Sequence, residues 1–378
     1  TSTMNIAIIG GGIIGLALGW QLSRRGAKVT IYERGEAGQQ ASRAAAGMLA
    51  PYAEVGFEEI ELMKLGRESL RLYPRFLGEL SEDAPHVPKF DQCGTLLIGT
   101  DRDDTEYLRR LYAFREKLEL TVQLITGTEA REREPLLSPR VVSAVWLPDD
   151  AQIDNRQLIQ SLKQAFLACG GRLKEHSLVE EVTCSGRAAK GILTESGRFE
   201  CDAVVVAAGS WSGQIAGIPG PSVQPVRPVK GQIITLQKTG ECDLQGIVRS
   251  PRMYLVPKED GTIRLGATSE EKGFDTVPTA GGVKELLEES WEAVPSIYDL
   301  PLMEITAGLR PASRDHMPVI GQSETEGLYY ATGHYRHGIL LTPATVYALT
   351  DEILNRDIPN ILHPFRPNRF QKNRKQRA

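Results

Sequence analysis

The stretch IAIIGGGIIGLALGWQLSRRG, residues 6–26, decides the fold expected for this chain. An apolar run over 4–9 leads into it and predicts a buried β-strand. Directly after this run stand glycines with the spacing G-x-G-x-x-G, namely Gly10, Gly12 and Gly15. Glycines at this spacing let the backbone approach a dinucleotide pyrophosphate and let a helix pack closely on the strand.

The residues that follow complete a βαβ unit. A helical pattern covers 13–25 and ends at Gly26, and a second strand covers 28–32. Glu33 closes this strand 18 residues after Gly15, where an acid can accept hydrogen bonds from a ribose hydroxyl. Strand, spacing, helix and acid together predict dinucleotide binding, with phosphate oxygens at the helix N-terminus. The alternative is a tight glycine turn without a ligand.

Composition restricts the class of protein. The chain has 378 residues, of which 41% are hydrophobic, and a formal net charge of −4. This length favours two domains, and the slightly acidic balance gives no support for a nucleic-acid partner. The sequence shows no signal-peptide pattern and no apolar run long enough to span a bilayer, so we expect no stable membrane association. The basic segment 366–378 is expected to be a solvated tail.

The cysteines also argue for a reducing compartment. They are five in number, scattered, and without a C-x-x-C spacing: Cys93, Cys169, Cys184, Cys201 and Cys242. Such a set argues against a disulfide framework, a zinc site or a dithiol redox pair. We therefore expect a cytoplasmic protein with no metal.

Two later segments repeat the pattern of an apolar strand that ends in small residues and glycine. They are DAVVVAAGSWSG over 202–213 and LYYATGHYRHGILLTPAT over 328–345. Because each strand ends where a ligand could lie, we expect one sheet assembled from distant parts of the chain. Strand-like segments between them predict a second, mostly antiparallel sheet, and they cover 94–99, 141–147, 231–236, 253–256, 262–267 and 303–307. A helix is expected over 105–120.

The segment after Glu33 separates a nicotinamide dehydrogenase from a flavoenzyme. Instead of regular βα alternation, the chain enters a loop of small residues, SRAAAGMLAP over 42–51, whose backbone amides a large ligand could approach. This loop, GGGIIG, AGLRPASRDHMPVIG and ATGHYRHGILLTPAT together resemble the D-amino-acid oxidase superfamily of FAD enzymes. Within it they are most similar to the glycine oxidases associated with the thiazole branch of thiamine biosynthesis. The resemblance runs from Met4 to about Phe365.

The resemblance implies a fold of the class α/β plus α+β. A Rossmann-like FAD-binding domain would interleave with a mostly antiparallel substrate domain. The FAD-binding domain would comprise 4–88, 148–222 and 305–365, and the substrate domain 89–147 and 223–304. The basic tail at 366–378 would belong to neither.

The resemblance also implies the residues that contact FAD. The expected set is Gly10, Gly12, Ile13, Ile14, Gly15, Glu33, Arg34, Ala41, Ser42, Ala46, Gly47, Met48, Val179, Gly209, His334, Tyr335, Arg336, His337, Gly338, Ile339 and Leu340. A helix N-terminus beside the flavin could stabilise negative charge on the reduced ring. For Val179 an ordinary core strand residue is the alternative. Since AGLRPASRD lacks the cysteine that covalent members carry near the flavin, the FAD is expected to be non-covalent.

On the substrate side, the resemblance implies Arg310 as the carboxylate clamp, because a planar guanidinium pairs with both carboxylate oxygens. Arg336 is a second candidate, with a structural bridge to a nearby acid or carbonyl as its alternative. The resemblance also places Tyr254 at the substrate carboxylate and Met48 on the pocket wall, although either could be packing. Arg252-Met253 stands where these oxidases can have His-Cys, so an added positive charge there could shift the acid preference.

No acid–base residue is expected to act in catalysis. Hydride transfer from the α-carbon of a neutral amine to flavin needs no protein base at carbon. His316 and His334 are therefore assigned to packing or hydrogen bonding.

The function implied is an FAD-dependent oxidase. Glycine, sarcosine and small D-amino acids would become imine and oxo acid, with hydrogen peroxide from oxygen. The alternatives are a sarcosine or D-amino-acid oxidase, a quinone-linked dehydrogenase, and a non-catalytic flavin-binding subunit. The resemblance further implies a homo-oligomer (a tetramer) and a functional link to thiazole synthase.

Overall fold

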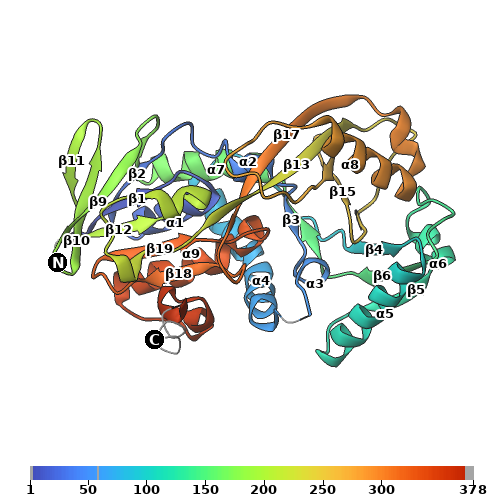
Figure 1. Cartoon of the computed structure of the whole chain (residues 1–378), viewed down its shortest axis with the longest axis horizontal. Helices are drawn as coiled ribbons and strands as arrows, with labels where there is room; N and C mark the ends of the chain where they lie inside the picture. Colours follow the sequence, from blue (N-terminus) through green and yellow to red (C-terminus); the bar gives the residue numbers. More distant parts are fainter. Residues whose placement is uncertain (1–2, 58, 371–378) are drawn as a thin grey trace.

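A computed structural model describes residues 3–57 and 59–370, and its centre is a six-stranded sheet. The strands lie in the order β18-β19-β12-β1-β2-β8 and are parallel except for β18. Their bounds are β1 Asn5–Ile9, β2 Lys28–Tyr32, β8 Arg172–Lys174, β12 Ala203–Val206, β18 Val319–Gln322 and β19 Leu328–Thr332. The expected sheet assembled from distant parts of the chain is therefore confirmed (Figure 1).

The predicted βαβ unit forms as expected. Helix α1, Ile13–Arg24, follows β1 and returns the chain to β2. A side chain at Gly15 would place its Cβ 2.0 Å from the carbonyl oxygen of Gly10, so only glycine lets α1 begin this close to the loop. Helix α1 is apolar on nearly every face and is buried almost throughout, which is typical of a helix covered on both sides.

Three long helices bury α1. They are α4 Ile60–Asp83, α7 Asn155–Ala168 and α9 Gly338–Asn355. Helices α7 and α9 each pack on α1, and α4 packs on α9. The rings of Trp20 and Phe76 meet edge to face with centroids 5.3 Å apart, which joins α1 to α4. These contacts hold the N-terminus of α1 rigidly beneath the glycine loop.

The second sheet has eight strands in the order β17-β13-β16-β15-β14-β4-β6-β5, all antiparallel except the β14–β4 pair. The bounds are β4 Thr95–Gly99, β5 Gln123–Thr126, β6 Ser143–Leu147, β13 Arg227–Gln237, β14 Ile247–Arg249, β15 Tyr254–Pro257, β16 Thr262–Gly266 and β17 Leu302–Ala312. Each of the six segments expected to be strands lies in this sheet. β13 and β17 are the longest and run from the second sheet toward the first (Figure 1).

Smaller elements complete the fold. A three-stranded sheet consists of β9 Val179–Ser185, β10 Ala188–Thr194 and β11 Gly197–Glu200, and β3 Met48–Leu49 pairs with β7 Ala151–Gln152. The other helices are α2 Ala41–Ala44, α3 Pro51–Glu54, α5 Arg102–Lys117, α6 Gly127–Arg133 and α8 Ala280–Ala293. Short 3₁₀ helices cover η1 Gly209–Gln214, η2 Gly220–Ser222, η3 Pro295–Asp299, η4 Asn360–Phe365 and η5 Pro367–Phe370. The domain boundaries given above stay a prediction.

The expected solvated tail needs a correction over 366–370. Arg366 pairs with the buried Glu352 of α9 at 2.6 Å, and Arg369 pairs with Asp315 at 2.9 Å. These two ion pairs fasten the segment to the six-stranded sheet, because Glu352 also accepts the backbone N–H of Gln322 in β18. The rest of the predicted tail, 371–378, lies outside the described residues.

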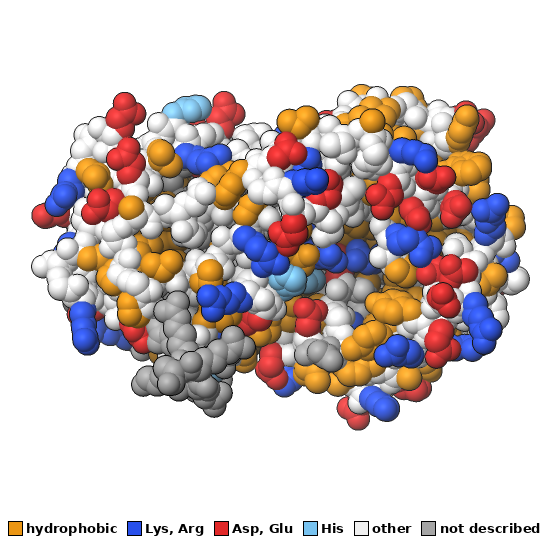
Figure 2. All heavy atoms as spheres, viewed as in Figure 1, with side chains coloured by type: hydrophobic (Ala, Val, Ile, Leu, Met, Phe, Trp, Pro, Cys, Tyr) orange, Lys and Arg blue, Asp and Glu red, His pale blue; other side chains and the backbone are white. Residues whose placement is uncertain are grey.

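Across 3–57 and 59–370, no helix is both long and apolar enough to cross a membrane. On the face in Figure 2, Lys and Arg side chains alternate with Asp and Glu rather than forming a patch of one sign.

Candidate active site

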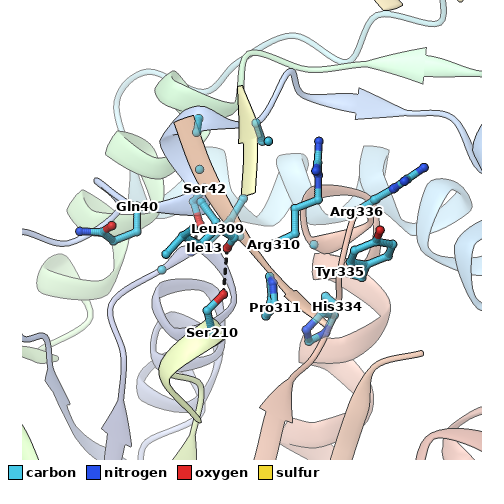
Figure 3. A pocket seen from close by; sticks show the side chains of 18 of the residues that line it. Ile13, Gln40, Ser42, Ser210, Leu309, Arg310, Pro311, His334, Tyr335 and Arg336 are labelled. Carbon is cyan, nitrogen blue, oxygen red and sulfur yellow. Dashed lines mark hydrogen bonds between the residues drawn. The ribbon is translucent and has the colours of Figure 1, made fainter. Parts of the chain in front are cut away.

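A cavity of about 870 Å³ lies between the two sheets. Its wall includes the glycine loop after β1, the ends of β12 and β19, and the facing ends of β13, β15 and β17. Figure 3 shows side chains from these distant segments directed into one space. The carboxyl ends of the parallel strands thus meet the eight-stranded sheet at one elongated site.

The glycine loop is held in place by side chains from outside it. Glu33 is buried and accepts the backbone N–H groups of Gly11 at 2.8 Å and Gly35 at 2.9 Å. Ser42 accepts the N–H of Ile13 through its hydroxyl at 3.0 Å. Since Ile13 begins α1, the first N–H of the helix is already engaged beside the cavity. The loop is therefore preorganised around the helix N-terminus, which suits a pyrophosphate.

The end of the cavity near Glu33 has the features of an adenosine site. The Arg34 guanidinium stacks on the Trp211 ring at 3.9 Å from the centroid, which extends a flat surface along the wall. Val179 also lines the cavity, at the start of β9. An acid for ribose hydroxyls, a flat cationic surface and an apolar strand end are all compatible with an adenosine group.

The middle of the cavity accepts a flat ring system. Gly47 has φ +75°, and a Cβ there would lie 2.1 Å from the carbonyl oxygen of Ile153. The N–H of Ile153 donates to the Gly47 carbonyl at 2.9 Å, and the buried Lys258 Nζ donates to the Ile153 carbonyl at 2.9 Å. Burial lowers the pKa of Lys258 to about 7. These hydrogen bonds fix the small-residue segment on the cavity wall, and its small side chains leave room for an isoalloxazine. The residues present fit FAD.

Helix α9 begins at Gly338 on the cavity wall, so its N-terminus points at this middle region. The positive end of the helix dipole can stabilise negative charge there. His334 lies just before α9, and a hydrogen bond of 3.0 Å joins its Nε2 to the Thr345 hydroxyl. Burial lowers the pKa of His334 to about 3, so the imidazole is neutral. This agrees with the assignment of His334 to hydrogen bonding rather than to acid–base chemistry.

The far end of the cavity carries Arg310 and Tyr254. Arg310 Nη1 donates to the carbonyl oxygen of Thr268 at 2.9 Å, and no acid among the described residues forms an ion pair with it. Burial lowers the pKa of Arg310 from its ordinary value, and burial raises the pKa of Tyr254 to about 12. A half-buried cation without an acid partner, beside a protonated phenol, is an anion-binding arrangement.

The neighbouring loop supplies Arg336 and Tyr335. Arg336 is exposed, lies 5.1 Å from the Tyr335 ring centroid, and forms no ion pair with any described residue. Neither an ion pair with an acid nor a hydrogen bond to a carbonyl, the structural alternative for Arg336, is observed among the described residues. Tyr335 in turn stacks on His316 with ring centroids 4.5 Å apart. Figure 3 shows Arg310 and Arg336 extending from adjacent backbone segments.

Most of the sequence-predicted site residues line this one cavity. Those that do are Gly10, Gly12, Ile13, Ile14, Glu33, Arg34, Ala41, Ser42, Ala46, Gly47, Met48, Val179, Gly209, Tyr254, Arg310, His334, Tyr335, Arg336, Gly338 and Ile339. Gly15, His337 and Leu340 are not brought to its wall. Gly15 serves the contact between α1 and the loop, while His337 and Leu340 point into the protein, with 4% and 1% exposure.

Sequence reasoning missed Glu54, Arg249 and Trp211, which also line the cavity. Each lies outside the motifs that carry the resemblance. Arg252 lines the cavity as well, and it pairs with Asp104 at 3.3 Å and Glu289 at 2.8 Å. The added charge expected there is thus offset by two acids.

Comparisons with known proteins agree with this site. The family described as "DAO: FAD dependent oxidoreductase" matches residues 5–352. The glycine oxidase of Geobacillus kaustophilus is 33% identical over 367 residues, 97% of each chain. Its crystal structure superposes with a TM-score of 0.90 over 97% of this chain and 99% of that one, at 32% identity.

A bifunctional protein ThiO/ThiG from Trichormus variabilis is 33% identical over 373 residues, 98% of this chain. The chain spans about half the length of this bifunctional relative, 56%. The predicted fold class, the FAD cofactor and the enzyme class are confirmed by the family match and these relatives. The chain therefore belongs to the DAO family of FAD-dependent oxidoreductases, and within it the chain is similar to glycine oxidases.

Proposed function

We propose that this enzyme oxidises glycine, sarcosine and small D-amino acids to the corresponding imine. The observation that carries the proposal is Arg310, a half-buried guanidinium without an acid partner beside Tyr254 at the end of the cavity. A carboxylate supplies the missing negative charge, and its two oxygens match the planar guanidinium. The glycine oxidase relatives add support for the substrate class.

The protein residues bind and orient the substrate rather than exchange protons at carbon. Arg310 and the Tyr254 hydroxyl hold the carboxylate, and Met48 bounds the space for the α-carbon. When bound, FAD would supply the two-electron oxidation: it would take the α-hydrogen of the neutral amine as hydride and pass the two electrons to oxygen, which with two protons would give hydrogen peroxide. Water then hydrolyses the C=N bond of the released imine to an oxo acid and ammonia, or methylamine from sarcosine.

A supporting role in thiazole formation is part of the proposal. It is supported by the ThiO/ThiG relatives, in which a segment similar to this chain belongs to a protein named for two functions. The imine, or the oxo acid that follows from it, would be the product passed on.

Anaerobic mixing of the holoenzyme with glycine or sarcosine tests the proposal. We expect loss of the flavin absorbance in the absence of oxygen and rapid recovery on admission of air, with stoichiometric peroxide. Bleaching followed by slow recovery in air and fast recovery with a quinone would identify a dehydrogenase. No bleaching by any amino acid would leave a flavin-binding subunit as the better account.

A further inference from the structure

A second charged pair faces the substrate end of the cavity. Arg249, the last residue of β14, donates from Nη1 to Oε1 of Glu54 at 3.1 Å. Both residues line the cavity, yet their side chains are only 14% and 5% exposed. The pair joins the end of α3 to the eight-stranded sheet across 195 residues of sequence.

The sheet register puts this pair next to the carboxylate site. Arg249 and Tyr254 are directly paired across β14 and β15, so their side chains leave the same face of the sheet. Burial has the largest effect on the pKa of the Tyr254 phenol and raises it. Among the nearby charges, the Arg310 and Arg249 guanidinium groups lower this pKa, and the Glu54 carboxylate raises it. Glu54 and Arg249 therefore lie close enough to act on the group that would contact the substrate.

The pair differs from the other cations of the cavity. Arg310 has only carbonyl oxygens as partners and is open to a carboxylate. Arg252 is 44% exposed and is offset by Asp104 and Glu289 at the rim, where water and salt screen it. Arg249 is nearly buried and is offset by one acid that faces the same space.

We propose that the Glu54–Arg249 pair is a specificity site that keeps the wall beside Tyr254 and the carboxylate clamp electrically neutral, so that the enzyme rejects substrates with a second charged group. The inference rests on the proposed function, because it takes the first carboxylate to be held by Arg310. Glycine, sarcosine and small neutral D-amino acids meet no charge at this wall. A second carboxylate approaches Glu54 as closely as Arg249, and a second ammonium approaches Arg249 as closely as Glu54.

Removing one member of the pair shifts the preference in a direction that depends on which charge is left. In Glu54→Gln, the uncompensated Arg249 becomes a second anion site. In Arg249→Gln, the uncompensated Glu54 repels a second anion more strongly. These opposite directions cannot result from general loosening of the pocket, since cavity damage would change both variants alike.

The test uses two ligands of nearly equal shape, succinate and its monoamide succinamate, bound to purified holoenzyme. Their dissociation constants are measured from the change in the flavin absorbance spectrum, without turnover. We expect the ratio of the succinate to the succinamate dissociation constant to fall at least tenfold in Glu54→Gln and to rise at least tenfold in Arg249→Gln. Tenfold corresponds to about 1.4 kcal/mol. The double variant should return to within threefold of the unmodified enzyme.

Arg252→Gln is the matched control, because it removes a guanidinium from the same cavity but at the screened rim. Its ratio should move less than threefold. Equal ratios in all variants, shifts of the same sign in both single variants, or no spectral response to either ligand in any variant would overturn the inference. If Glu54→Gln does not retain FAD, the inference is tested by the other two variants. The ratio of the succinate to the succinamate dissociation constant should then rise in Arg249→Gln and return in the double variant.

Glycine bleaching on the same preparations keeps the two proposals apart. If glycine bleaches the flavin but the ratio of the two dissociation constants is the same in all variants, only the specificity site is contradicted. Shifted ratios without bleaching by any amino acid defeat the proposed oxidase function and leave the charge pair as a binding determinant.

Discussion

Arg310 is the residue on which substrate capture depends in the proposed function. It leaves β17 at the cavity wall, and its guanidinium has carbonyl oxygens rather than a carboxylate as partners. A cation held this way in a partly desolvated place retains most of its attraction for an incoming carboxylate, since water screens it weakly. Gly231 on β13 makes room for it: a Cβ there would lie 2.4 Å from Nη2.

Replacing Arg310 by Ala should lower kcat/KM for glycine at least tenfold while the FAD content stays the same. Truncating one partner of a buried charge pair costs about 2–5 kcal/mol, and the fork that orients the α-carbon is lost as well. Arg310→Lys should recover only part of the loss, because an ammonium lacks the planar geometry. Steady-state peroxide production measures both variants. For an amine without a carboxylate, kcat/KM should fall much less in Arg310→Ala. Near-normal glycine turnover in this variant would mean that another residue anchors the carboxylate.

Residues within motifs could be predicted from sequence, and residues outside them could not. Glu33 and Ser42 follow from spacing and resemblance, and both hold the glycine loop through hydrogen bonds. Glu54 and Arg249 each look like an ordinary surface charge in sequence. Only the register of β14 with β15 and the placement of α3 bring them together.

At the scale of elements, the short helix α3 is held by two buried polar side chains, Asp150 and Arg115. Its Tyr52 N–H donates to Asp150 at 3.2 Å, and the Tyr52 carbonyl accepts from Arg115 Nε at 3.0 Å. Asp150 and Arg115 are both fully buried. Burial raises the pKa of Asp150 to about 8. The seat of α3, which carries Glu54 into the cavity wall, therefore depends on a carboxyl that keeps its proton near neutral pH.

This carboxyl makes the stability of the protein depend on pH. Below about pH 4, the ordinary pKa of Asp, both the folded and the unfolded state hold the proton. As the pH rises toward 8, only the folded state keeps it, so Asp150 lowers the free energy of unfolding progressively across this window.

Asp150→Asn removes the titration while keeping an acceptor for Tyr52. We expect its free energy of unfolding, relative to the unmodified protein, to increase by at least about 1.4 kcal/mol between pH 5.5 and 7.5. Denaturant unfolding of the holoenzyme at the two pH values measures the difference. A difference that is constant or falls with pH would contradict the raised pKa.

Strong periodicity decided which elements could be predicted. Ten of the fourteen strands that the structure describes in the two large sheets were predicted, as was the helix at α5. The strands β5, β8, β14 and β18 were not predicted, because each has only three or four residues and β5 and β8 are mostly exposed. The small sheet of β9, β10 and β11 was not predicted, because its strands mix Glu, Lys and Arg with short apolar stretches and face solvent on one side. Its charged pattern is shared by ordinary surface loops.

For the whole molecule, the cofactor cavity is the place where the two sheets meet. FAD bound in this cavity would contact segments of both sheets, so it should stabilise the folded state more strongly the higher its affinity. None of the five cysteines lines the cavity. The one that packs beside Tyr254 and Ala46 is Cys93, and burial raises the pKa of its thiol to about 11. A thiol so far from ionising is a poor nucleophile toward a flavin.

The purified protein should therefore be yellow and should release its flavin on acid precipitation. We expect FAD in the supernatant, identified by chromatography against FMN and FAD standards, and a colourless pellet. Colour that stays with the pellet would mean a covalent bond and would direct attention to Cys93. Readdition of FAD to refolded apoprotein should raise its Tm, since ligand binding to the folded state alone stabilises it.

The order of strands in the six-stranded sheet has a consequence for the ribosome-bound chain. β1 and β2 emerge first, yet β12, β19 and β18 come from residues 203–332, and α9 extends to Asn355. Contacts this distant in sequence form slowly, because long stretches of chain must close before they can be made. Residues as far as Asn355 must leave the exit tunnel before the glycine loop has all of these neighbours. FAD is therefore expected to bind only after this part of the chain has been synthesised, and until then the apolar α1 is a segment for chaperones to shield.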